Sequence, residues 1–150
     1  MIPDVLRKFV RLPAHDRALL VRTTVTLGAA RLATWLLPFA LSRRLLARAQ
    51  GTPSNITGDR IRWAMSHAQR VVPRATCLPQ AIAAEALLTS SGLPAQLQIG
   101  VTKTASGGLL AHAWVESDGR IIVGDLPGGL GVYTRLPTIP REWPGSRAAR

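Results

Sequence analysis

The segment from residue 110 to residue 125 restricts the fold most strongly, because it has the pattern of a β-hairpin. Asp118-Gly119 is typical of a two-residue type I′ turn, and apolar runs flank it on both sides. Directly opposed residues of such a hairpin point to the same face. The predicted pairs are Ser117–Arg120, Glu116–Ile121, Val115–Ile122, Trp114–Val123, Ala113–Gly124 and His112–Asp125. The hairpin therefore places a carboxylate beside an imidazole, unless a bulge shifts the register by one residue.

Cys77 is the only cysteine of the chain, and it is a candidate nucleophile. A single cysteine cannot form an intramolecular disulfide and alone makes a poor metal site, which leaves a buried thiol or a nucleophile. Thr76 is a good helix N-cap, and the residues from 80 to 88 favour a helix. Cys77 would then begin a helix whose dipole and unpaired N–H groups stabilise a thiolate. With His112 and Asp125 it would form a nucleophile, a base and an orienting acid.

Each of these residues also has an ordinary structural explanation. A lone cysteine is usually a small buried hydrophobe, and a lone histidine on a strand is usually structural. Asp125 could simply begin the turn that follows, and Asp118 is the rival acid, although the Asp-Gly turn already accounts for it. Gln80 is a candidate oxyanion donor that we leave outside the catalytic set. Glu85 and Glu116 are expected to be solvated.

Three motifs in a fixed order resemble a known family. They are Thr76-Cys-Leu-Pro-Gln-Ala81, Leu97-Gln-Ile-Gly-Val101 and Ala111-His-Ala-Trp-Val-Glu116. The order Cys, His, Asp resembles the transglutaminase-like branch of papain-type cysteine hydrolases. The set of three motifs resembles one family more closely, the lasso-peptide leader peptidases. These peptidases are the transglutaminase-like half of the lasso-peptide biosynthesis B protein. This resemblance covers roughly residues 61 to 125.

The resemblance implies a protease that removes the leader from a ribosomally made lasso precursor peptide. Carried over by motif, its triad falls on Cys77, His112 and Asp125, with no cofactor and no metal. The lasso B protein often carries a recognition domain with strands ahead of its peptidase, whereas residues 1–55 look helical. The chain therefore resembles the split form. This form implies three partners: the precursor peptide, a separate leader-recognition protein and, as a further candidate, the lasso cyclase.

Composition and charge limit the other functions. The chain has 150 residues with 47% apolar and 18% charged content, which favours one folded domain. Its unpaired cysteine and the absence of a secretory signal favour the cytoplasm. The net charge is +11, and residues 1–50 supply +7 of it, from nine Lys or Arg and two Asp or Glu. No helix-turn-helix, zinc-finger or RNP-type pattern accompanies this charge, so we expect no nucleic-acid partner.

The apolar stretch from residue 19 to residue 46 raises the question of a membrane. Four arginines and Pro38 interrupt it, whereas a spanning helix needs about 20 consecutive apolar residues. We therefore expect soluble helices with an apolar face, with interfacial membrane contact as the alternative.

The remaining pattern predicts helices followed by sequential strands. Helices are expected over 16–37, 42–49, 57–69 and 77–88, and strands over 95–101, the hairpin and 132–136. This order predicts an α+β fold of the transglutaminase-like or papain-like type, with N-terminal helices packed on a small antiparallel sheet. We divide the chain into an N-terminal helical region (1–55), a transglutaminase-like cysteine peptidase core (56–136) and an irregular tail (137–150).

Three functions follow in order of preference. The first is leader removal by a cysteine peptidase. The second keeps the same site but uses an amine as acyl acceptor, which makes a transglutaminase-type acyltransferase. The third is a non-catalytic interaction module in which the basic helices dock a partner, and an intact Cys/His/Asp set argues against it.

Overall fold

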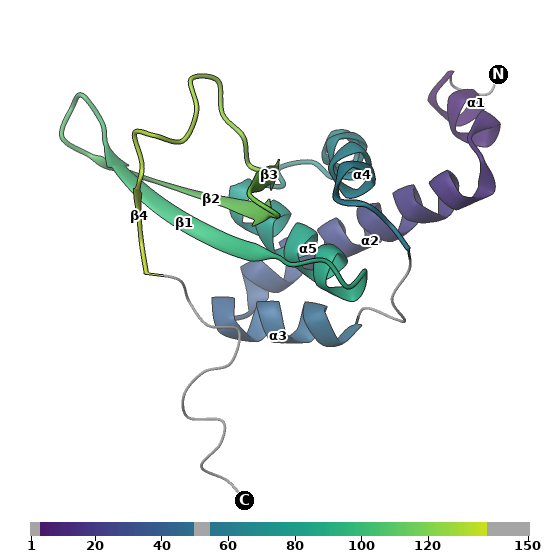
Figure 1. Cartoon of the computed structure of the whole chain (residues 1–150), viewed down its shortest axis with the longest axis horizontal. Helices are drawn as coiled ribbons and strands as arrows, with labels where there is room; N and C mark the ends of the chain where they lie inside the picture. The colour runs from purple at the N-terminus through teal and green to yellow at the C-terminus, as the bar shows by residue number, and fades with distance from the viewer. Residues whose placement is uncertain (1–3, 50–54, 138–150) are drawn as a thin grey trace, which may run out of the picture.

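A computed structural model of the chain describes residues 4–49 and 55–137, which form five helices and one four-stranded sheet (Figure 1). The helices are α1 (Asp4–Arg11), α2 (Ala14–Leu36), α3 (Phe39–Ala49), α4 (Gly58–Val71) and α5 (Cys77–Ser90). The strands are β1 (Gln96–Lys103), β2 (Leu109–Ser117), β3 (Arg120–Val123) and β4 (Thr134–Arg135). They lie in the order β3-β2-β1-β4, and every neighbouring pair is antiparallel. The predicted α+β class is confirmed.

Helix α5 is the centre of the molecule. It packs against strands β1, β2 and β3 on one side and against helices α2, α3 and α4 on the other. Its sequence explains this place, because nine of its 14 residues are buried and four of those are alanines. A helix that is apolar all round belongs inside a core, and small side chains let its neighbours approach closely. Helix α5 therefore lies between the sheet and helices α2 and α3. The β1–β2 hairpin extends away from the helices (Figure 1).

The helix boundaries follow local chemistry. Helix α2 ends before Pro38, whose ring disfavours a helical conformation in the residue ahead of it. Helix α4 begins after Thr57, whose hydroxyl accepts a hydrogen bond from the N–H of Arg60. The first helix, α1, was not anticipated from the sequence. Among the described helices none is both long and apolar enough to cross a membrane. The prediction of an irregular tail concerns residues that lie, apart from Pro137, outside the described range.

The hairpin turn is confirmed, but most of the predicted register is wrong. Asp118 and Gly119 both have positive φ angles, 49° and 73°, as a type I′ turn requires. The first two pairs are as predicted, Ser117 with Arg120 and Glu116 with Ile121. A bulge follows, so that Val115 pairs with Val123 and not with Ile122. Val123 thus does not pair with Trp114, and the predicted pairs Ala113–Gly124 and His112–Asp125 do not form, because β3 ends at Val123.

The bulge lies where β3 enters the core. Ile122 and Val123 are consecutive, each is only 5% exposed, and both belong to the hydrophobic core cluster. The extra residue of a bulge interrupts the alternation of a strand and changes its direction. Both side chains therefore contribute to the core at the point where the register shifts.

An ion pair is buried between helices α3 and α5. Arg43 donates from Nε to Glu85 Oε2 (2.8 Å) and from Nη2 to Glu85 Oε1 (2.5 Å), and the guanidinium lies 5.4 Å from the centre of the Phe39 ring. The exposed fractions of Arg43 and Glu85 are only 7% and 4%. The expectation that Glu85 is solvated is therefore wrong. The pair fixes the position of α3 against the central helix.

Replacing Glu85 by alanine should destabilise the protein by about 3–5 kcal/mol, because the buried Arg43 charge loses its carboxylate. The double variant Arg43→Met/Glu85→Leu should recover most of that loss, since no charge is then left buried. Denaturant unfolding of the two variants measures both effects. A Glu85→Ala variant as stable as the wild type would show that the pair does not hold α3 in place.

Candidate functional site

The three predicted site residues line one hollow of about 410 Å³. Cys77 comes from the start of α5, His112 from β2, and Asp125 from the loop after β3. Helix α4 forms a further wall through Arg62 and Met65. The fold thus gathers residues that lie far apart in the sequence around a single space.

Cys77 occupies the first position of α5 as a free, partly buried thiol. Thr76 is the N-cap residue as predicted, although its side chain makes no capping hydrogen bond. The first turn of a helix leaves backbone N–H groups without intrahelical partners. Pro79 has no N–H, and the N–H of Gln80 donates to the Thr76 carbonyl oxygen (3.4 Å). The amides of Cys77 and Leu78 are therefore the donors of this turn that the helix does not use, and they flank the thiol.

Gln80 has a structural task beside the thiol. Its Nε2 donates a hydrogen bond of 2.6 Å to the carbonyl oxygen of Ala75, two residues before Cys77. This contact ties the segment that leads into α5 to the first turn of the helix. Gln80 also lines the hollow, and its amide nitrogen has a second N–H beside the one given to Ala75.

His112 is oriented by a backbone carbonyl. Its Nε2 lies 2.7 Å from the carbonyl oxygen of Gly124. A carbonyl oxygen only accepts hydrogen bonds, so Nε2 carries the proton and Nδ1 holds the free lone pair of the neutral ring. The ring also stacks near Trp114, with centroids 6.2 Å apart, and tilts against Tyr133 at 5.7 Å. These contacts present Nδ1 as the nitrogen that can accept a proton.

Gly124 is a functional residue that the sequence analysis missed. Its φ of 93° lies in the region that favours glycine. A Cβ at this position would stand 2.6 Å from Trp114 Cβ and 2.7 Å from the Ala113 carbonyl oxygen. Only glycine lets the chain approach β2 closely enough to bring its carbonyl to His112. The available signal was a glycine at the end of a strand, directly ahead of the candidate acid.

Asp125 lies in the hollow but does not contact His112 as predicted. Its side chain is 56% exposed, and Oδ2 lies 3.9 Å from Nη2 of Arg62. No hydrogen bond joins its carboxylate to His112 in the described part of the chain. Arg62 also donates to the carbonyl oxygen of Ile121 (3.4 Å), so α4 is bound to both ends of the bulged strand. The register accounts for the difference, because β3 bulges after Ile121 and its pairing with β2 ends at Val115–Val123, so that Asp125 lies in the loop beyond the strand.

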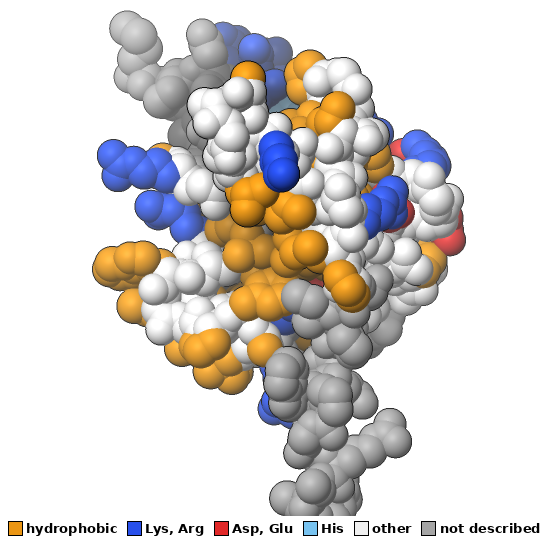
Figure 2. Space-filling view, turned by 90° about the vertical axis from the view of Figure 1, so that its left-hand side faces the viewer, with side chains coloured by type: hydrophobic (Ala, Val, Ile, Leu, Met, Phe, Trp, Pro, Cys, Tyr) orange, Lys and Arg blue, Asp and Glu red, His pale blue; other side chains and the backbone are white. Residues whose placement is uncertain are grey.

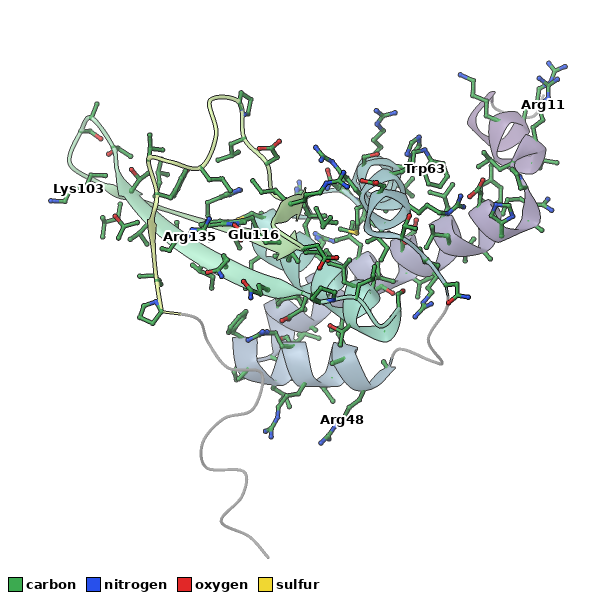
Figure 3. The ribbon with its side chains drawn as sticks, viewed as in Figure 1. Arg11, Arg48, Trp63, Lys103, Glu116 and Arg135 are labelled. Atoms are coloured by element: carbon green, nitrogen blue, oxygen red, sulfur yellow. The ribbon has the colours of Figure 1, made fainter. Side chains whose placement is uncertain are left out.

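A second polar cluster lies beside His112 on strands β2 and β4. Glu116 accepts a hydrogen bond from Trp114 Nε1 (2.9 Å) and pairs with Arg135 Nη2 (2.8 Å), whose guanidinium also lies over the Trp114 ring (Figure 3). Burial alone raises the pKa of the Glu116 carboxyl, but the hydrogen bonds from Trp114 and Arg135 and the Arg135 charge hold its pKa below 4.5. Glu116 is thus not simply solvated. The cluster fixes the indole against which His112 stacks.

Gly124→Ala should lower turnover by about 10²-fold or more, because its Cβ displaces the carbonyl that orients His112. Gly119→Ala is the matched control. It also places alanine at a positive φ, at a cost of about 1–2 kcal/mol, but its Cβ meets nothing within 4 Å. Steady-state kinetics should rank the losses as Gly124→Ala, then Asp125→Asn, then a mild Asp118→Asn. A larger loss of turnover for Asp125→Asn than for Gly124→Ala would show that the Asp125 carboxylate, and not the Gly124 carbonyl, orients His112.

Comparison with known proteins agrees with this geometry. The model of the transglutaminase-like superfamily matches residues 19–138, and this match includes most of α2, helices α3 to α5 and the whole sheet. No curated protein and no solved structure matches the chain. The superfamily comprises cysteine hydrolases and acyltransferases, which suits a thiol at a helix start beside a histidine. The chain belongs to the transglutaminase-like superfamily.

Proposed function

We propose that this protein is a cysteine peptidase that removes the leader from a ribosomally made lasso precursor peptide. One observation carries the chemistry: Cys77, His112 and Asp125 line the same hollow, and His112 keeps Nδ1 free as a base. The choice of a lasso precursor rests on the resemblance of the three ordered motifs. In this proposal the protein acts in the cytoplasm, and residues 56–136 carry the chemistry. Residues 1–55 are its N-terminal helical region, from which α2 and α3 pack against α5.

The mechanism begins with proton transfer from the Cys77 thiol to Nδ1 of His112. The thiolate attacks the scissile carbonyl carbon, and the N–H groups of Cys77 and Leu78 stabilise the oxyanion that forms. His112 then gives its proton to the leaving amine, which is the amino end of the core peptide. The leader remains as a thioester on Cys77 until water, deprotonated by His112, hydrolyses it.

Asp125 has an electrostatic role in this mechanism. His112 becomes an imidazolium after the first proton transfer, and a carboxylate lining the same hollow favours that charge. Arg62 opposes this effect in part, because its guanidinium lies 3.9 Å from the same carboxylate. In this mechanism the Gly124 carbonyl fixes the orientation of the His112 ring, and the Asp125 carboxylate stabilises the positive charge that the ring acquires.

The second candidate is acyl transfer to an amine, which superfamily membership favours equally. The two activities share every step up to the thioester. They differ only in whether water or an amine attacks it, so the products decide between them.

Cys77→Ala should abolish precursor cleavage and leave the fold intact, because the thiol is small and the helix keeps its N-cap. Incubation of the precursor with the wild type, with and without a primary amine, separates the two activities. Mass spectrometry should find the free leader carboxylate in both reactions. A leader amide, heavier than the free leader acid by the mass of the amine less one water, would establish an acyltransferase. An active Cys77→Ala variant would exclude the cysteine mechanism.

We also propose that a separate leader-recognition protein delivers the precursor, with the lasso cyclase acting on the released core peptide. The described residues before α4 are three helices and contain no strand with which to bind an extended leader. Tethering by a partner raises the effective concentration of substrate at a weakly binding site.

Addition of the recognition protein should therefore raise the cleavage rate by about 10²-fold at limiting precursor. A precursor that lacks most of its leader should lose this gain, and it is the control. An unassisted rate that already saturates, equal for both precursors, would show that this chain recognises its substrate alone.

A further inference from the structure

Helix α2 is apolar on two opposite faces, and the described residues of the chain cover only one of them. Its buried face consists of Leu19, Thr23, Thr26, Leu27 and Ala30, which pack toward α4 and α5. On the other face the exposed fractions of Val21, Val25, Leu32 and Trp35 are 52%, 65%, 55% and 81%. Figure 2 shows that hydrophobic side chains gather over a broad area of the face at the left of Figure 1. A helix that is apolar all round normally has neighbours on every side.

The spacing of the uncovered side chains fits a second helix. Ala18, Val21, Val25, Gly28, Leu32 and Trp35 follow one another at alternating steps of three and four residues. This is the a and d pattern of a heptad repeat, whose narrow seam receives the side chains of a partner helix. With Ala18 at position a, the buried residues of α2 occupy positions b, c and f of the heptad, which lie on the opposite side of the helix. We define these six residues as the α2 seam.

Charge identifies the kind of partner. Arg17 and Arg31 occupy g positions beside the α2 seam, and Arg22 occupies an e position, where it donates to Ser90 Oγ (2.9 Å). No acidic residue occupies an e or g position between residues 15 and 36. Two copies of the seam would bring arginines together, so self-pairing is disfavoured. Acidic side chains at e and g of a different helix would complement the arginines.

The α2 seam leads to the candidate active site. Leu32, Trp35 and Arg31 line a hollow of about 670 Å³ that Thr76 also lines. Thr76 lines the hollow of Cys77 as well. The two hollows thus share a wall at the start of α5, so a helix on the seam ends beside the residues that hold the thiol.

We propose that the α2 seam binds an amphipathic α-helix of a partner protein that carries acidic side chains beside its apolar stripe. This docking goes beyond leader cleavage and does not depend on the chemistry of Cys77. It gives the chain a place to hold a partner next to the catalytic hollow.

The test uses the full chain with Cys77→Ala, so that cleavage plays no part. The probe is a fluorescein-labelled helical peptide of three heptads, with leucine at a and d and glutamate at e and g. A second peptide has lysine in place of glutamate. Fluorescence anisotropy should show binding of the glutamate peptide and at least about tenfold weaker binding of the lysine peptide. The double substitution Arg17→Glu/Arg31→Glu should reverse this preference.

Substitutions in the α2 seam test whether the glutamate peptide binds there. Val25→Glu and Leu32→Glu should each weaken binding of the glutamate peptide by at least about tenfold. Leu45→Glu on α3 is the matched control, because Leu45 is 44% exposed but lies outside the seam, and it should change nothing. Circular dichroism checks that each variant is folded.

Three results would overturn the proposal. The first is equal affinity for the two peptides, or no binding of either. The second is a dimer in sedimentation experiments that Leu32→Glu disperses, which would make a second copy the occupant. The third is binding to phosphatidylglycerol vesicles that Val25→Glu abolishes while the peptides do not bind, which would make the seam a lipid surface. None of these results bears on the cleavage assays.

Discussion

The candidate site depends on one close approach, that of Gly124 to strand β2. The approach requires a residue without Cβ, and it requires the bulge that turns the strand after Ile121. At the bulge the consecutive apolar side chains Ile122 and Val123 are both buried in the core. The next carbonyl oxygen, that of Gly124, accepts the hydrogen bond of His112 Nε2 and so sets the tautomer of the ring. Gly124 therefore links the close packing of the chain against β2 with the orientation of His112.

The orientation of a histidine by a backbone carbonyl has consequences for catalysis. A carboxylate partner would both fix the ring and attract its positive charge, whereas a carbonyl fixes the ring at lower electrostatic gain. In the proposed mechanism the two tasks fall on neighbouring residues, since Asp125 follows Gly124 directly and lines the same hollow. Arg62 of helix α4 lies near both the Asp125 carboxylate (3.9 Å) and the Ile121 carbonyl oxygen (3.4 Å). Both contacts are exposed to solvent, so the Gly124–His112 hydrogen bond is the closer link between the loop after β3 and β2.

The sequence predicts the elements well and the fine register poorly. Turn chemistry is local, so Asp118-Gly119 identifies the hairpin, and Thr76 places Cys77 at a helix start. The bulge has no such local signal, because Ile121, Ile122 and Val123 are all apolar and suit a regular strand equally well. Glu85 was misjudged because its environment is also set by residues distant in the sequence. Its burial depends on Arg43, which lies 42 positions away in the sequence and on another helix.

The two apolar faces of α2 also cannot be told apart from local sequence alone. Local periodicity shows a long helix with apolar residues at many positions, but it does not show which of them the fold buries. The assembled core uses the b, c and f positions and leaves the a and d positions uncovered. Burying four large apolar side chains on a partner would stabilise the complex, whereas leaving them in water costs free energy and invites aggregation. The helix docking proposed for the α2 seam would remove this cost, and the arginines along the seam would restrict which helices a second protein can offer.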